Sequence, residues 1–197
     1  MSIRALIFDF GGVIVRMVNE APRQQLASRF GVRLDTLYRL VFDSEMAQRA
    51  ALGEISFERH WQTVGRLLQI PDQESEPALE AFLSADDVDH ELIAWMRSLR
   101  PQYKIGLLSN AWDNLRGLLT ERWKIADVFD DLLISAEVGL VKPDPRIFEL
   151  AVCRLGVEPG EALFFDDTHD NVLAARLAGL QAYQYTDLAQ AQQALQG

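Results

Sequence analysis

Ile3-Arg4-Ala5-Leu6-Ile7-Phe8-Asp9-Phe10-Gly11-Gly12-Val13 joins a short apolar run to a carboxylate and then to two glycines. A continuous apolar run of this length is typical of a strand that helices bury on both faces. A carboxylate at the end of such a strand is costly for a core, and it usually persists because it does chemistry. Asp9 is therefore a candidate catalytic group, and the residue two positions later is Gly11 rather than a second acid.

Four further segments share this short, unalternated apolar pattern. They are Lys104–Ser109, Asp131–Ser135, Ala162–Asp166 and Gln181–Tyr185, and with Ala5–Asp9 they make five expected strands. Segments of helical period separate the later ones, at Leu115–Trp123, Pro145–Leu155 and Asn171–Leu177. Alternating strands and helices predict an α/β fold, with a doubly wound, Rossmann-like parallel sheet as its core.

The region between the first two strands has a different pattern. From Ala21 to about Leu99 no strand is expected, and helices are expected at Asp35–Ala51, Ser56–Gln69 and Pro77–Ser84. This predicts a small α-helical cap domain inserted after the first strand. We expect residues 17–86 to form the cap, and residues 1–16 and 87–197 to form the core.

Composition limits the function classes. The chain has 197 residues, 49% of them hydrophobic, and a formal net charge of −10. Without a long basic run, neither nucleic acid nor an acidic membrane surface is an expected partner. No apolar run reaches the roughly 18 residues of a membrane span, and the start lacks a secretory signal, so we expect a cytoplasmic protein. The single cysteine, Cys153, is expected in the core. The sequence does not indicate an oligomeric state.

Polar residues stand at or just after the carboxyl ends of four expected strands. These sites are Asp9 with Gly11-Gly12, Ser109-Asn110, Lys142, and Asp166-Asp167 with Asp170 beyond. The carboxyl ends of parallel strands line one ligand crevice, so we expect the four sites to meet. Each has an ordinary alternative: a helix N-cap for the paired aspartates, a turn for Ser109-Asn110, a solvated loop for Lys142. The ordinary alternatives would all have to coincide at four strand ends, so the set as a whole favours a functional site.

The order Asp-x-x-Gly-Val, Ser-Asn, Lys-Pro and Asp-Asp resembles the haloacid dehalogenase-like hydrolase superfamily along nearly the whole chain. The helical insertion is similar to that of its capped members. The resemblance implies an aspartyl nucleophile and Mg²⁺, in an enzyme that hydrolyses phosphoric monoesters. The residue types suit that chemistry, because a carboxylate can attack phosphorus and hard oxygen ligands hold Mg²⁺.

The resemblance implies a role for each residue. Asp9, Lys142 and Ser109 are the expected catalytic residues. Substrate contacts are expected from Phe10, Gly11, Ser109, Asn110 and Lys142, through backbone N–H groups in the turn, side-chain donors and the lysine charge. The expected metal ligands are Asp9, the Gly11 carbonyl, Asp166 and Asp167, while Asp170 lies at or behind the metal.

Gly11 leaves three interpretations open. Most phosphatases of this superfamily carry an acid there, which protonates the leaving alcohol. The preferred interpretation is a magnesium-dependent phosphatase for a small phosphorylated metabolite whose leaving group needs no acid, or which takes its proton from another group. It is similar to sugar-phosphate phosphatases with Asp-x-Gly-x-Val. The alternatives are a metal-independent 2-haloacid dehalogenase, and a non-catalytic module that binds a phosphorylated ligand or a protein.

Overall fold

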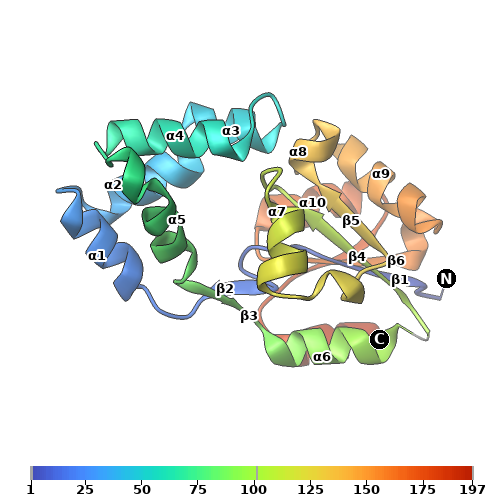
Figure 1. The fold of residues 1–197 in the computed structure, drawn as a ribbon. Helices are drawn as coiled ribbons and strands as arrows, with labels where there is room; N and C mark the ends of the chain where they lie inside the picture. The colour runs from blue at the N-terminus through green and yellow to red at the C-terminus, as the bar shows by residue number, and fades with distance from the viewer. Residues whose placement is uncertain (1, 101, 197) are drawn as a thin grey trace.

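The computed structural model describes residues 2–100 and 102–196 (Figure 1). Its centre is a five-stranded parallel sheet in the order β5-β4-β1-β6-β7. The strands are β1 (Ala5–Phe8), β4 (Lys104–Ser109), β5 (Asp131–Ile134), β6 (Ala162–Asp166) and β7 (Gln181–Gln184). The expected α/β class and the doubly wound parallel sheet are therefore confirmed.

Helices cover both faces of the sheet. One face packs on α9 (Pro145–Leu155) and α10 (His169–Leu177), and the other on α6 (His90–Leu99), α11 (Leu188–Gln196) and the turns of α7 (Leu115–Gly117) and η3 (Leu118–Arg122). Because strand side chains alternate, Leu6 and Phe8 enter one apolar cluster while Ala5 and Ile7 enter the other. The short elements α8 (Ser135–Val138), η4 (Ala126–Val128) and η5 (Pro159–Glu161) complete the core.

A group of helices stands apart from the sheet in Figure 1. It comprises α1 (Ala21–Arg29), α2 (Leu34–Tyr38), η1 (Arg39–Asp43), α3 (Glu45–Ala51), α4 (Phe57–Leu67), η2 (Asp72–Glu74) and α5 (Ser75–Leu83). These helices share an apolar cluster of their own, against which Trp112 of the core also packs. The boundaries of a cap at residues 17–86 stay a prediction.

Hydrogen bonds fasten this helical group to the core. Ser135 Oγ donates to the Ala51 carbonyl at 2.7 Å and accepts the Ala111 N–H at 3.0 Å. The Phe57 N–H donates to Asp113 Oδ1 at 2.9 Å. The loops after β4 and β5 thus hold the cap helices above the strand ends.

Two strands were not expected. β2 (Val15–Met17) and β3 (Asp86–Val88) form an antiparallel ribbon between the sheet and the cap helices. The expectation of no strand between Ala21 and Leu99 was therefore wrong. Each strand has only three residues, too few for an alternating pattern, and β3 begins with two aspartates, which are uncommon in strands.

Local details differ from the expectations for physical reasons. The helix expected at Asp35–Ala51 is interrupted at Ser44, whose side chain accepts the Ala47 N–H and starts a new helix. Cys153 is exposed rather than in the core, because the buried Val152 and Leu155 hold the inward face of α9. No helix in residues 2–100 and 102–196 is long and apolar enough to cross a membrane.

Candidate active site

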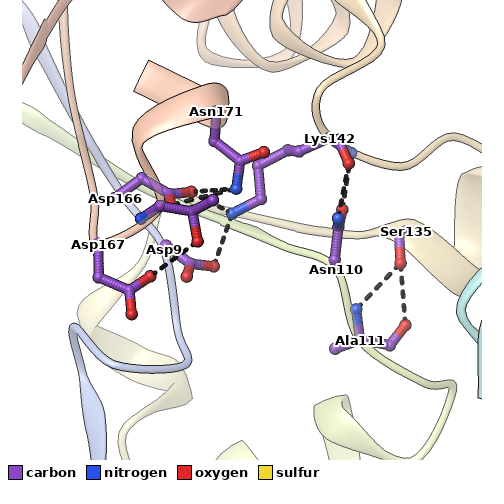
Figure 2. A network of polar contacts seen from close by, with 9 residues as sticks. Asp9, Asn110, Ala111, Ser135, Lys142, Asp166, Asp167 and Asn171 are labelled. Atoms are coloured by element: carbon purple, nitrogen blue, oxygen red, sulfur yellow. Dashed lines mark hydrogen bonds and ion pairs between the residues drawn. The ribbon is translucent and has the colours of Figure 1, made fainter. Parts of the chain in front are cut away.

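Three of the predicted residues meet at the carboxyl edge of the sheet. Asp9 directly follows β1, Asp166 ends β6, and Lys142 lies in the loop after α8. Lys142 Nζ donates to Asp9 Oδ1 at 2.7 Å and to Asp166 Oδ2 at 2.6 Å. Figure 2 shows the lysine between the two carboxylates. Adjacent parallel strands, β1 and β6, bring residues 157 positions apart into one network.

Lys142 is not a solvated loop lysine, since only 1% of its side chain is exposed. Burial by itself lowers the pKa of its ammonium, but the charges of Asp9 and Asp166 outweigh burial and raise that pKa. The lysine therefore keeps its positive charge at neutral pH. It supplies a fixed positive charge at the carboxyl edge of the sheet, in a protein whose net charge is negative.

The carboxyl group of Asp9 has a raised pKa. Burial raises the pKa of its carboxyl to about 6, with a further rise from Asp166 and an opposing effect from Lys142. At neutral pH the carboxylate is ionised yet poorly solvated. A desolvated anion held by one hydrogen-bonded cation is suited to act as a nucleophile.

Asp166 is held by groups that follow it in the chain. Asn171 Nδ2 lies 3.1 Å from both carboxylate oxygens, and the Thr168 N–H donates to Oδ1 at 2.8 Å. Thr168 is the N-cap of α10, so neither Asp166 nor Asp167 is the N-cap considered as an alternative. Sequence reasoning missed Asn171 as a site residue. Its place in the first turn after a catalytic strand end was the available signal.

Asp167 completes an acidic cluster. One carboxylate oxygen from each of Asp9, Asp166 and Asp167 lies within 4.8 Å of the others. Asp170 is exposed on α10 and stands outside this cluster. Three converging carboxylates with one lysine leave an excess of negative charge that a hard divalent cation would balance. The donor set therefore fits Mg²⁺, and the roles of these residues as ligands stay a prediction.

The glycine turn is shaped around Asp167. Gly12 has φ of +76°, and a Cβ there would lie 2.2 Å from Asp167 Oδ2. Gly11 differs, because a Cβ added there meets no atom within 4 Å. Of the two glycines, only Gly12 combines a positive φ with a close neighbour, so a side chain there would strain the backbone and displace Asp167.

Asn110 positions Lys142. Its Nδ2 donates to the Lys142 carbonyl at 2.8 Å, and its Oδ1 accepts the Lys142 N–H at 2.7 Å (Figure 2). This pairing fixes the loop that delivers the ammonium, a contact that the sequence did not predict. The expected hydrogen bond from Asn110 to a phosphoryl oxygen stays a prediction for its second amide hydrogen.

A cavity of about 580 Å³ opens beside these groups. Its lining includes Phe10, Gly11, Gly12, Ser109 and Asn110. Ser109 is buried at the end of β4, and its contact with the substrate stays a prediction. Residues of β2, β3 and the cap helices line one part of the wall, and residues 111–123 after β4 line another, so cap and core together shape the space around the candidate substrate.

Comparison with known proteins identifies the class. The family model described as haloacid dehalogenase-like hydrolase matches residues 3–179. D-ribitol-5-phosphate phosphatase of Bacteroides thetaiotaomicron is 27% identical over 190 residues, covering 92% of this chain and 91% of its own. A phosphatase of Mycobacterium tuberculosis is 28% identical, with 93% of this chain and 87% of its own covered.

The fold agrees. A haloacid dehalogenase-like enzyme of Bacteroides thetaiotaomicron, solved with magnesium and inorganic phosphate, has a TM-score of 0.80 at 22% identity, covering 96% of this chain and 99% of that one. The chain belongs to the haloacid dehalogenase-like hydrolase family. It is an enzyme of that family, and both of these relatives are named as phosphatases.

Proposed function

We propose that the protein is a magnesium-dependent phosphatase of a small phosphorylated metabolite, with Asp9 as the nucleophile. The observation that carries the proposal is the placement of Lys142 between Asp9 and Asp166, beside a third carboxylate, Asp167. The named phosphatases among the relatives support the same reaction.

In the first step an Asp9 carboxylate oxygen attacks phosphorus. A new bond forms between that oxygen and phosphorus, the bond from phosphorus to the ester oxygen breaks, and the alcohol leaves with a proton from solvent. The product is an aspartyl-phosphate. Lys142 holds the nucleophile in place and offsets the charge that two neighbouring carboxylates bring to the site.

Water then attacks phosphorus and releases phosphate, restoring the Asp9 carboxylate. Ser109, Phe10 and Gly11 line the cavity, and the Ser109 hydroxyl and the backbone N–H of Gly11 would donate hydrogen bonds to phosphoryl oxygens. Asp9, Asp166, Asp167 and the Gly11 carbonyl would hold Mg²⁺, which supplies charge neutralisation for the transferring group.

The acidic cluster favours this proposal over the dehalogenase alternative. A 2-haloacid is itself an anion, and displacement of halide needs no metal. Three converging carboxylates would then repel the substrate with only the Lys142 ammonium to compensate. A non-catalytic binding module would have no need for a desolvated Asp9. A cytoplasmic location stays a prediction.

The test is phosphate release from a panel of phosphorylated metabolites, assayed with Mg²⁺ and with EDTA. We expect activity to require Mg²⁺ and to fall at least 1,000-fold in Asp9→Asn, as order-of-magnitude losses of this size accompany removal of a nucleophile. Asp72→Asn, an exposed aspartate of the cap, is the matched control. Activity that survives EDTA or Asp9→Asn would overturn the proposal, as would metal-free halide release from 2-haloacids.

A further inference from the structure

The cavity of about 580 Å³ continues directly from the proposed phosphoryl site. Ser109, Asn110 and the Phe10–Gly12 turn line its inner end, while β2, β3, the cap helices and the segment after β4 line most of the remainder. Whatever alcohol is esterified to the phosphate must therefore lie in this space. The volume is within the range of about 300–1,000 Å³ that is usual for small-molecule sites.

The outer wall of the cavity is largely apolar and aromatic. Its main members are Met17, Phe42, Phe82, Trp112, Leu118 and Trp123. Phe42 stacks on Trp112, with ring centroids 5.8 Å apart and planes at 10°, yet 45% of Phe42 remains exposed. Phe42 also stacks on Tyr38, with ring centroids 6.2 Å apart, so its neighbours fix the ring while its remaining exposed part offers apolar surface to a ligand.

One pair of polar groups in that wall is engaged internally. Arg23 Nε donates to the Phe82 carbonyl at 3.1 Å, its Nη2 pairs with Asp86, and its guanidinium lies 4.1 Å from the Phe82 ring centre. Arg16 lies over the Tyr185 ring at 5.4 Å, and its buried Nε has no hydrogen-bond partner among the described residues. A polyol would need a partner for each buried hydroxyl, and Arg23 and Asp86, which are paired with each other, do not supply one.

The leaving group must also depart without a general acid to protonate it. Gly11 has no side chain to donate a proton, and Asp86, the one carboxylic acid among the cavity-lining residues of the described chain, is paired with Arg23. A phenol-type oxygen, with a pKa of about 10 like that of tyrosine, is a much better leaving group than the alkoxide of a sugar alcohol.

We propose that the substrate carries its phosphate on an apolar aromatic group, as an aryl phosphate monoester, rather than on a polyol. This inference rests on the proposed phosphatase function and narrows it, and it departs from the sugar phosphate suggested by the sequence. Two independent features carry it: the aromatic wall around Phe42 and Trp112, and the absence of a proton donor at Gly11.

The test separates binding from leaving-group reactivity. Phenyl phosphate and 1-naphthyl phosphate have similar leaving groups but different apolar area, so a difference in KM between them reports on the cavity. We expect a KM about tenfold lower for 1-naphthyl phosphate, and a kcat/KM at least 100-fold higher for it than for ribitol 5-phosphate. Acetyl phosphate, which has no large alcohol portion, reports on the chemistry alone.

Phe42→Ala supplies the matching variant. We expect it to lower the ratio of kcat/KM for 1-naphthyl phosphate to that for acetyl phosphate at least fivefold, while Phe42→Leu lowers it less. Leu67→Ala, an exposed apolar residue of the cap outside the cavity lining, should leave the ratio unchanged. Thermal melts of each variant establish that it is folded.

The outcomes are distinguishable. Equal KM values for the two aryl phosphates, or a preference for ribitol 5-phosphate, overturn the inference and leave the phosphatase function standing. An unchanged ratio in Phe42→Ala overturns the inference as well. If neither acetyl phosphate nor any ester is hydrolysed, the proposed function fails and this inference fails with it.

Discussion

The ammonium of Lys142 lies 2.6 Å from Oδ2 of Asp166, and neither side chain has more than 1% of its surface exposed. Asp9 shares the same ammonium at 2.7 Å. Burying charges is expensive unless they are paired and hydrogen-bonded. The sheet edge therefore carries a structural cost that the proposed chemistry explains.

The first prediction concerns this pair. Lys142→Met keeps the apolar stem but leaves Asp9 and Asp166 facing each other without a cation. We expect the free energy of unfolding to fall by about 3 kcal/mol, the usual cost of removing one partner of a buried ion pair. Chemical denaturation measures it. Lys104→Met, an exposed lysine at the start of β4, should change stability by less than about 0.5 kcal/mol.

Equal stability of Lys142→Met and Lys104→Met would show that the buried ammonium does not offset the carboxylate charge. Phosphate release in Lys142→Met should be lost, because the nucleophile is no longer held. The two readouts separate a folding defect from a catalytic one when activity is measured well below the melting temperature.

The second prediction concerns the turn after Asp9. Gly12→Ala would place a methyl group 2.2 Å from Asp167 Oδ2, so we expect Asp167 to shift and Mg²⁺ affinity to fall. Gly31→Ala is the control, because Gly31 also has a positive φ but meets nothing within 4 Å. In both variants the left-handed backbone conformation lowers the free energy of unfolding by about 1 kcal/mol. Only Gly12→Ala should weaken Mg²⁺ binding in calorimetry, and equal affinities would contradict the packing argument.

A third prediction separates two neighbouring aspartates. Asp167 belongs to the acidic cluster, whereas Asp170 is exposed on α10. Asp167→Asn should weaken Mg²⁺ binding by about tenfold or more, because it removes a charged oxygen ligand. Asp170→Asn should change it by less than about twofold. Titration of Mg²⁺ by calorimetry tests this, and the reverse order would move the metal site toward α10.

The fourth prediction restores an acid. The space around Gly11 admits a side chain, so Gly11→Asp should fold normally. General acid catalysis is worth about 10²–10⁴-fold. We therefore expect kcat to rise about tenfold or more for alkyl phosphates, whose alkoxides are poor leaving groups. Aryl phosphates should gain little. A uniform loss across substrates would show that the new carboxylate disturbs Asp9 instead of donating a proton.

The fifth prediction follows from the titration of Asp9. Its pKa is raised from 3.8 to about 6 in the folded state, so between these values the folded protein binds more protons than the unfolded chain. The contribution of Asp9 to the stability of the metal-free protein therefore falls as pH rises from 4 to 6. The total is up to about 3 kcal/mol. Asp9→Asn should gain stability relative to the wild type over this window, measured by denaturation in EDTA, and a constant difference would contradict the shift.

The sequence predicted the main features because each depends on local pattern. Short apolar runs identified the five strands of the sheet, and the polar residues at their ends identified Asp9, Lys142 and Asp166. Parallel strands gather their carboxyl ends at one edge, so order along the chain was enough to expect a shared site.

Other contacts could not be predicted from the sequence. The β2–β3 ribbon has three residues in each strand, and its pairing joins segments about 70 positions apart. The Asn110 amide holds the Lys142 main chain, and Asn171 holds Asp166, because neighbouring loops and a helix start happen to face each other. Nothing in the spacing of these residues shows which way their side chains point.

By itself the sequence determined the fold class and the residues that meet at the sheet edge, because strand periodicity and chain order fix both. Only the tertiary structure decided that Lys142 is buried between two carboxylates and that Asp167, not Asp170, joins them. It also decided that aromatic side chains of both the cap and the core wall the cavity beside Gly11. These features depend on how loops and cap helices pack across the strand ends, and that packing involves contacts between distant parts of the chain.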